Sequence, residues 1–145
     1  MKRRKPIKQK SDKKRLREKI GTIHLALLKR QRGDMCEIHG RQCSNIGRMH
    51  ILPVGKYPRL EFEDANVILA GWLCSHYWTH HDPDDKRAIY TKKRILELRA
   101  CKTWDELRTE FILRDRLHDP ITMFYLYCLH DYLEGKLNEK LKTNF

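Results

Sequence analysis

The first part of the chain carries apolar residues at helical spacing. Between Ser11 and Gly33, apolar side chains return every three or four residues: Leu16, Ile20, Ile23 and Leu27. Such a period is typical of one buried face of an α-helix. Ser11 is a suitable N-cap and Gly33 a suitable C-terminal stop. The pattern therefore predicts a helix across this segment.

After residue 81, three cap signals predict further helices. Asp82-Pro83 joins an N-cap to a proline suited to the first helical turn and predicts a helix that ends near Ala100. Thr103-Trp-Asp-Glu106 matches a capping box, and Asp119-Pro120 repeats the first signal. An apolar stripe follows it: Ile121, Phe124, Cys128 and Tyr132. We expect residues 101–145 to form a helical buttress with this stripe in the core.

The middle of the chain alternates short apolar runs with turn residues. The expected elements are a turn-rich knuckle over 34–48, a short strand from Asn45 to Leu52, an exposed loop over 53–64, a second strand or helix lead-in over 66–70, and a helix from Trp72 to His81. Prolines and glycines mark the loop. This order indicates an α+β fold with an N-terminal arm and helix over 1–33, a core over 34–100 and the buttress over 101–145.

The composition suits one compact domain with an appended arm. A chain of 145 residues with 40% hydrophobic content can bury a modest core. No apolar run approaches the roughly 20 residues that a membrane span needs. We therefore expect a soluble, cytoplasmic protein. The five cysteines are accompanied by histidines, which favours metal binding in a reducing compartment over a disulfide framework.

The positive charge is concentrated at the N-terminus. Residues 1–32 hold 14 Lys and Arg against two acidic residues, whereas residues 33–145 hold 17 of each sign. A polyanion such as DNA is the expected partner, since each cation near a phosphate releases condensed counterions. A solubilising tail is the alternative. The candidate DNA contacts are Lys2, Arg3, Arg4, Lys5, Lys13, Lys14, Arg15, Arg48, Lys56 and Arg59.

Cysteine and histidine are enriched between Met35 and Pro83, which holds five of the eight histidines and three of the five cysteines. Cys36-x-x-His39 has the spacing of half a zinc knuckle. Cys74 is the natural third ligand, and either Cys43 or His76 would be the fourth. A structural zinc would stabilise a segment too poor in apolar residues to fold by burial alone. The alternative is a set of reduced, uncoordinated thiols.

A second group of residues suits hydrolytic chemistry. His50 follows a predicted strand and precedes a loop, where a neutral imidazole can take a proton from water. His76 and His80 lie one helical turn apart and can share a divalent cation, which would stabilise a departing oxygen. Asn66 would orient His50 or bind the cation, although a turn or cap is the commoner use of asparagine.

Together these residues resemble an HNH endonuclease, a nuclease with a ββα-metal, treble-clef-like motif, and more narrowly the phage recombination endonucleases of the NinG/Rap type. The resemblance covers roughly residues 35–100. Its parts are Cys36-Glu-Ile-His39-Gly40, Met49-His50, Pro58-Arg59-Leu60-Glu61-Phe62 before Asn66, Gly71-Trp72-Leu73-Cys74, and His80.

The resemblance implies that His50 is the general base, that Asn66 is a positioning residue and that His80 binds the catalytic metal. It implies one divalent cation, Mg²⁺ or Mn²⁺, and hydrolysis of a DNA phosphodiester in phage recombination or DNA processing. The protein would then work in the host cytoplasm.

The sequence departs from the family pattern at three positions. Met49 stands where many HNH enzymes place a metal-binding aspartate or histidine. His39 replaces the second knuckle cysteine, which zinc tolerates. Gly71 replaces the third, so Cys43 or His76 would have to take its place.

Two other functions fit the same residues. A non-catalytic zinc module that binds nucleic acid would use the ligands for structure alone. A protein-interaction adaptor would dock a recombination or replication protein, or a second copy of itself in a homodimer, on a C-terminal helix with four aromatic residues, although such a helix is more often core: Phe124, Tyr125, Tyr127 and Tyr132.

Overall fold

The computed structural model describes residues 10–79, 84–112 and 118–142, and within these ranges it shows an α+β protein. The chain divides into two compact units. One combines Met1–His24 with Thr122–Phe145, and the other is Leu25–Ile121. Helix α1 (Asp12–Arg32) contributes residues to both units, so this division does not coincide with boundaries after residues 33 and 100. The predicted class, α+β, is confirmed.

Helix α1 begins and ends as its sequence predicts. The Ser11 hydroxyl accepts a hydrogen bond from the Lys14 N–H at 3.3 Å, which is an N-cap contact. Gly33 follows the helix with a φ of +88°, and its N–H donates to the Lys29 carbonyl at 2.8 Å. Helix α1 is therefore defined at both ends, and its residues from Leu25 onward belong to the second unit.

The apolar stripe predicted for the C-terminal helix is wrong. In α5 (Met123–Lys142), Leu126 and Leu133 are buried, whereas Phe124, Cys128 and Tyr132 are exposed. Leu126 and Leu133 are seven residues apart, close to two full turns, so they share one face of the helix. The predicted stripe lies on other faces, and of its members only Ile121, before the helix, is buried.

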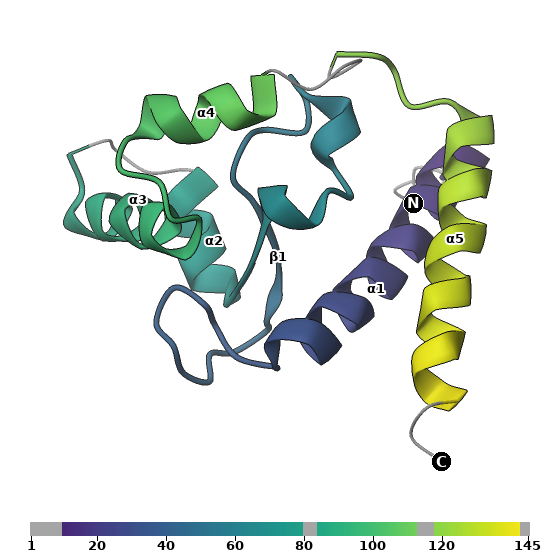
Figure 1. The fold of residues 1–145 in the computed structure, drawn as a ribbon, viewed down its shortest axis with the longest axis horizontal. Coiled ribbons are helices and arrows are strands. Elements are labelled where there is room, and N and C mark those ends of the chain that lie inside the picture. Colours follow the sequence, from purple (N-terminus) through teal and green to yellow (C-terminus); the bar gives the residue numbers. More distant parts are fainter. Residues whose placement is uncertain (1–9, 80–83, 113–117, 143–145) are drawn as a thin grey trace, which may run out of the picture. The chain divides into compact units, whose positions relative to one another are not determined.

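The second unit is built on a short antiparallel hairpin. Strand β1 (Gly47–His50) pairs with β2 (Val67–Ala70) in a register that sets His50 opposite Val67. All four residues of β2 are buried. Helix α2 (Trp72–Thr79) follows at once, and α3 (Lys86–Leu98) lies beside it (Figure 1).

A single apolar cluster joins the hairpin to the helices that follow it. Its members come from the knuckle, both strands, the loop between them and three helices: Cys36, Ile38, Met49, Ile51, Leu52, Tyr57, Leu60, Ile68, Ala70, Cys74, Ile95, Cys101, Leu107 and Phe111. Two of the predicted metal ligands, Cys36 and Cys74, are part of this core. Helix α4 (Trp104–Ile112) closes it with Leu107 and Phe111.

One of the three predicted helix starts is confirmed. The Glu106 N–H donates to the Thr103 hydroxyl at 3.1 Å, as a capping box requires. Helix α3 begins later than predicted, because its N-cap is Asp85, which accepts a hydrogen bond from the Arg87 N–H. Asp82 and Pro83 themselves lie outside the described residues.

The start predicted at Asp119-Pro120 is also too early. Helix α5 begins at Met123, and the Thr122 hydroxyl accepts a hydrogen bond from the Tyr125 N–H at 3.2 Å. Two short 3₁₀ turns, η1 (Pro58–Leu60) and η2 (Asp64–Asn66), form part of the connection between the strands. None of the helices in the described ranges has the length and apolar content of a membrane span.

Candidate functional site: a metal centre beside the hairpin

The knuckle turns tightly between Cys36 and Arg41. The Gly40 N–H donates to the Cys36 carbonyl at 2.7 Å, and the Cys36 N–H donates to the Arg41 carbonyl at 2.9 Å. Gly40 has a φ of +65°, a conformation that glycine adopts without steric cost. The turn brings the side chains of Cys36 and His39 to the same end of the loop.

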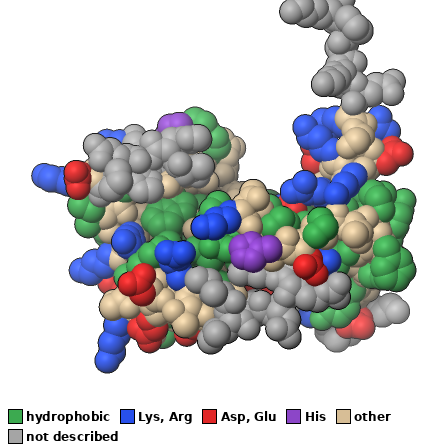
Figure 2. Space-filling view, turned by 90° about the horizontal axis from the view of Figure 1, so that it is seen from above, with side chains coloured by type: hydrophobic (Ala, Val, Ile, Leu, Met, Phe, Trp, Pro, Cys, Tyr) green, Lys and Arg blue, Asp and Glu red, His purple; other side chains and the backbone are tan. Residues whose placement is uncertain are grey.

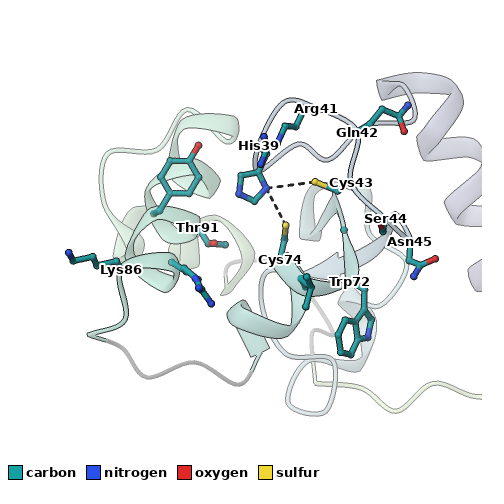
Figure 3. A pocket seen from close by; sticks show the side chains of 14 residues that line it. His39, Arg41, Gln42, Cys43, Ser44, Asn45, Trp72, Cys74, Lys86 and Thr91 are labelled. Carbon is teal, nitrogen blue, oxygen red and sulfur yellow. Dashed lines mark hydrogen bonds between the residues drawn. The ribbon is translucent and has the colours of Figure 1, made fainter.

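Four side chains converge at this point: Cys36, His39, Cys43 and Cys74. Their donor atoms all lie within 4.8 Å of one another. His39 Nδ1 is 3.2 Å from the Cys74 sulfur, 3.7 Å from that of Cys36 and 3.9 Å from that of Cys43. The sulfurs of Cys36 and Cys74 are 3.7 Å apart. Figure 3 shows the His39 ring directed toward the sulfurs of Cys43 and Cys74.

These distances fit a tetrahedral zinc site. Zinc bonds of about 2.3 Å to sulfur and 2.0 Å to nitrogen imply ligand separations of about 3.8 Å between sulfurs and about 3.5 Å between sulfur and nitrogen. The observed separations scatter around these values. The cluster can therefore hold a metal ion such as zinc, with four protein ligands, which is the closed arrangement of a structural site.

Gly71 makes room for the fourth ligand. A Cβ atom built on Gly71 would lie 2.7 Å from the Cβ of Cys43 and 3.3 Å from the carbonyl oxygen of Ser44. In the HNH pattern that the sequence resembles, a cysteine stands where this chain has Gly71. Here the glycine lets the Cys43 backbone come close, so that Cys43 supplies the sulfur. Of the two candidates for the fourth ligand, the cluster includes Cys43, and His76 is not part of it.

The three thiols do not ionise alike. Burial opposes ionisation of Cys36, but backbone hydrogen bonds from Gly71 and His39, together with contacts to the His39 ring and Cys74, lower its pKa to about 7. Burial and the neighbouring Cys36 raise the pKa of Cys74 to about 12. The pKa of Cys43 is raised for the same two reasons. Without a cation, Cys43 and Cys74 therefore stay protonated, and a metal ion such as zinc bound between the sulfurs would allow all three to ionise.

The knuckle is fastened to the hairpin through Glu37. Its N–H donates to the Leu69 carbonyl at 2.7 Å, and its carboxylate accepts from the Leu69 N–H at 2.6 Å. Helix α3 holds the same turn from the other side, since Arg94 donates to the Glu37 carbonyl and Tyr90 to that of Ile38. The ring of Tyr90 is stacked with that of His39, with centroids 6.0 Å apart. Hairpin and helix thus position the first two ligands.

His50 is the last residue of β1, and its ring orientation is defined. Its Nε2 lies 2.8 Å from the Glu61 carbonyl oxygen. A carbonyl oxygen only accepts, so Nε2 carries the proton and Nδ1 is the basic nitrogen of the neutral ring. Arg48, two residues earlier on the same face of the strand, donates to the same carbonyl at 3.2 Å and lies over the Phe62 ring.

Asn66 is completely buried and serves the backbone around His50. Its side-chain oxygen accepts from the Leu52 N–H at 2.8 Å, and its amide nitrogen donates to the carbonyls of Leu52 and Leu60. The Asn66 carbonyl also accepts from the Ile51 N–H. These bonds hold the backbone that follows His50. They also occupy the amide oxygen, whose partner is the Leu52 N–H.

Two arginines that the sequence analysis did not single out hold the segment containing Asn66. Arg32 donates to the carbonyls of Asp64 and Val67, and Arg99 to those of Ala65 and Val67. Burial lowers the pKa of Arg99, and the neighbouring Arg32 lowers it further. Nothing in their spacing distinguishes these arginines from the other basic residues, so only the fold identifies them.

The remaining predicted residues take different places. His76 is exposed on α2 and is stacked with Trp72, with ring centroids 5.4 Å apart. Met49 is buried in the core, on the opposite face of β1 from His50, and cannot offer a donor to a cation. His80 lies outside the described residues. Trp78, two positions before it, donates from its indole N–H to the His50 carbonyl at 3.1 Å and so joins α2 to β1.

The candidate DNA contacts are distributed over both units. Lys13, Lys14 and Arg15 are exposed on α1, whereas Lys2 to Lys5 lie outside the described residues. Lys56 is exposed in the loop of the second unit, and Arg59 donates to the Pro120 carbonyl. Figure 2 shows Lys and Arg side chains spread over the visible face among exposed hydrophobic ones.

Comparisons with protein-family models, with curated protein sequences and with solved structures found no match to this chain. A function for this chain can therefore be argued only from the arrangement of the residues described above.

Proposed function

We propose that this protein is a small HNH-type endonuclease that hydrolyses DNA phosphodiester bonds with His50 as the general base. The observation that carries the proposal is the order β1, β2, α2 around one histidine. His50 ends the first strand, Asn66 fastens the backbone beside it, and Trp78 of the helix donates to its carbonyl. This is the order of elements that the ββα-metal resemblance implies.

His50 takes the proton of the attacking water in this mechanism. Its Nε2–H is committed to the Glu61 carbonyl, so the proton is accepted at Nδ1. The same hydrogen bond steadies the imidazolium that forms, because its donor becomes more acidic when the ring is charged. Arg48 holds the Glu61 carbonyl as well and thereby keeps the acceptor in place.

The donors expected for the catalytic cation do not form a site among the described residues. The Asn66 amide is bonded to backbone groups, His76 is stacked with Trp72, and His80 lies outside the described residues. The proposed proton transfer therefore uses His50 alone, and no residue is assigned to Mg²⁺ or Mn²⁺. The four residues that would hold a structural zinc do converge, and the ion would cross-link the knuckle, the loop at Cys43 and α2.

The first test separates cleavage from binding. His50→Ala should reduce nicking of plasmid DNA at least about a hundredfold, the usual contribution of a general base, while DNA affinity stays within about twofold. His118→Ala, which removes an exposed histidine of the same unit, is the matched control. Cleavage that survives His50→Ala, or an equal loss of cleavage and binding, would refute the assignment.

A zinc module that binds nucleic acid without cutting it is the second candidate. It is favoured because the four residues that could bind zinc lie together, whereas the residues expected to bind the catalytic cation form no such group in the described part of the chain. Zinc-loaded protein that binds DNA but shows no nicking with added Mg²⁺ or Mn²⁺ would establish this function in place of the first.

A further inference from the structure

A groove of about 790 Å³ opens over the outer side of the metal cluster. One wall is the knuckle and the loop after it, a second is the start of α2, and a third is the first two turns of α3. Figure 3 shows the His39 ring and the Cys43 and Cys74 sulfurs between Lys86 on one side and Trp72 on the other. We call this the knuckle groove. All of its lining belongs to the second unit.

The lining of the knuckle groove is positively charged. It includes Arg41, Lys86 and Arg87, all three exposed, and no Asp or Glu side chain. Lys86 and Arg87 occupy the first turn of α3, which contains no acidic residue. The Asp85 carboxylate caps this end of α3 and already supplies an anion to the helix N-terminus. The three cations on the lining, with no acidic side chain among the lining residues, favour a negatively charged ligand in the groove.

Aromatic rings are exposed along the same groove. Trp72 is 60% exposed, although tryptophan is highly buried on average, and Tyr90 is 50% exposed. The Trp72 ring is nearly parallel to that of His76, at an interplanar angle of 22°, and Tyr90 is stacked with His39 at 19°. These contacts hold the two rings in defined orientations. Rigid, solvent-facing aromatic rings beside cations are the usual platform for unpaired bases.

We propose that the knuckle groove binds an unpaired nucleotide of a DNA strand, with its base stacked on Trp72 and its phosphates held by Arg41, Lys86 and Arg87. The volume falls within the range of about 300–1,000 Å³ found for small-ligand pockets, which suits a nucleotide. In a duplex the bases are stacked on each other and cannot reach Trp72. DNA with a single-stranded or displaced segment is therefore the preferred substrate class.

This inference takes the identity of the polymer from the proposed function, but it does not require cleavage. Binding is measured with the full-length, zinc-loaded His50→Ala protein, by fluorescence anisotropy of a labelled oligothymidine of about twelve nucleotides and of a duplex of the same length. Trp72→Ala should weaken oligothymidine binding roughly tenfold and leave duplex binding unchanged, since stacking on one aromatic ring contributes about that factor. Trp72→Phe should restore most of the loss.

The cations have a matched control on the same helix. Lys86→Gln with Arg87→Gln should weaken oligothymidine binding, whereas Lys92→Gln with Lys93→Gln removes equal charge outside the groove and should not. Zinc content is measured for every variant. The inference is refuted if Trp72→Ala binds oligothymidine as the parent does, if it loses duplex and oligothymidine binding equally, or if both double variants behave alike.

Failure of this inference is distinguishable from failure of the proposed function. If cleavage depends on His50 but oligothymidine binding does not depend on Trp72, only the proposal for the knuckle groove is refuted. If oligothymidine binding depends on Trp72 but the protein has no nuclease activity, only the assignment of His50 as a general base is refuted.

Discussion

Gly71 shows how one missing side chain can complete a site. A closed zinc site needs a fourth ligand, and Gly71, just before α2, offers none. Instead, Cys43 lies against Gly71, so close that a Cβ atom on residue 71 would be 2.7 Å from the Cys43 Cβ. The obstruction would involve Cys43 Cβ and the Ser44 carbonyl, which are rigid parts of the chain. A larger residue therefore displaces the ligand itself.

Gly71→Ala should lower zinc affinity by at least about tenfold, the scale found when groups that position metal ligands are changed. Gly55→Ala is the control, because a Cβ there meets nothing within 4 Å. Competition with a chromophoric zinc chelator measures both. Equal affinities for the two variants would mean that Cys43 does not depend on this close approach.

At the scale of elements, the hairpin is held together by side chains acting on backbone groups. The strands are only four residues each, too few to be stable as an isolated pair. Asn66, Arg32 and Arg99 bind the carbonyls and amides that the connection between the strands leaves unpaired. The connection between the strands is therefore held by hydrogen bonds along its length, and His50 lies where this connection begins.

Asn66→Ala should destabilise the protein by about 3 kcal/mol, since it removes the side-chain partner of the buried Leu52 N–H and Leu52 carbonyl, while the Leu60 carbonyl keeps the Glu63 N–H. Asn138→Ala, on the exposed surface of α5, should change the free energy of unfolding by less than about 0.5 kcal/mol. Urea titration of the zinc-loaded proteins gives both values. A small effect at Asn66 would show that its hydrogen bonds are replaced by water.

For the molecule as a whole, the dominant feature is its uneven charge. Nine of the 31 Lys and Arg residues lie within residues 1–15, which contain one acidic residue, Asp12. The second unit carries the candidate site, while this segment carries much of the excess charge. Affinity for DNA and chemistry on DNA would then depend on different parts of the chain.

Deleting residues 1–15 should weaken binding to every DNA sequence and flatten its salt dependence, because each lost phosphate contact lowers the slope of log K against log salt by about 0.9. Removing residues 140–145, which carry two lysines and no acidic residue, is the control truncation. Binding is titrated from low to moderate salt. A slope unchanged by the N-terminal deletion would exclude that segment from the interface.

The sequence by itself determined what is local or chemical: the caps at Ser11 and Thr103, the stop at Gly33, the uneven charge, and three members of the cluster that can hold a metal ion. These depend on residue type and short spacing, which are visible in a linear chain. The helix starts predicted from Asp82 and Asp119 were too early, because α3 is capped by Asp85 and α5 by Thr122.

Only the tertiary structure decided between Cys43 and His76, assigned the Asn66 amide to the backbone of Leu52 and Leu60, and chose which face of α5 is buried. Each of these choices depends on segments that meet after folding. Spacing along the chain limits which side chains can meet, but the backbone approach at Gly71 and the packing of the core determine which of them do.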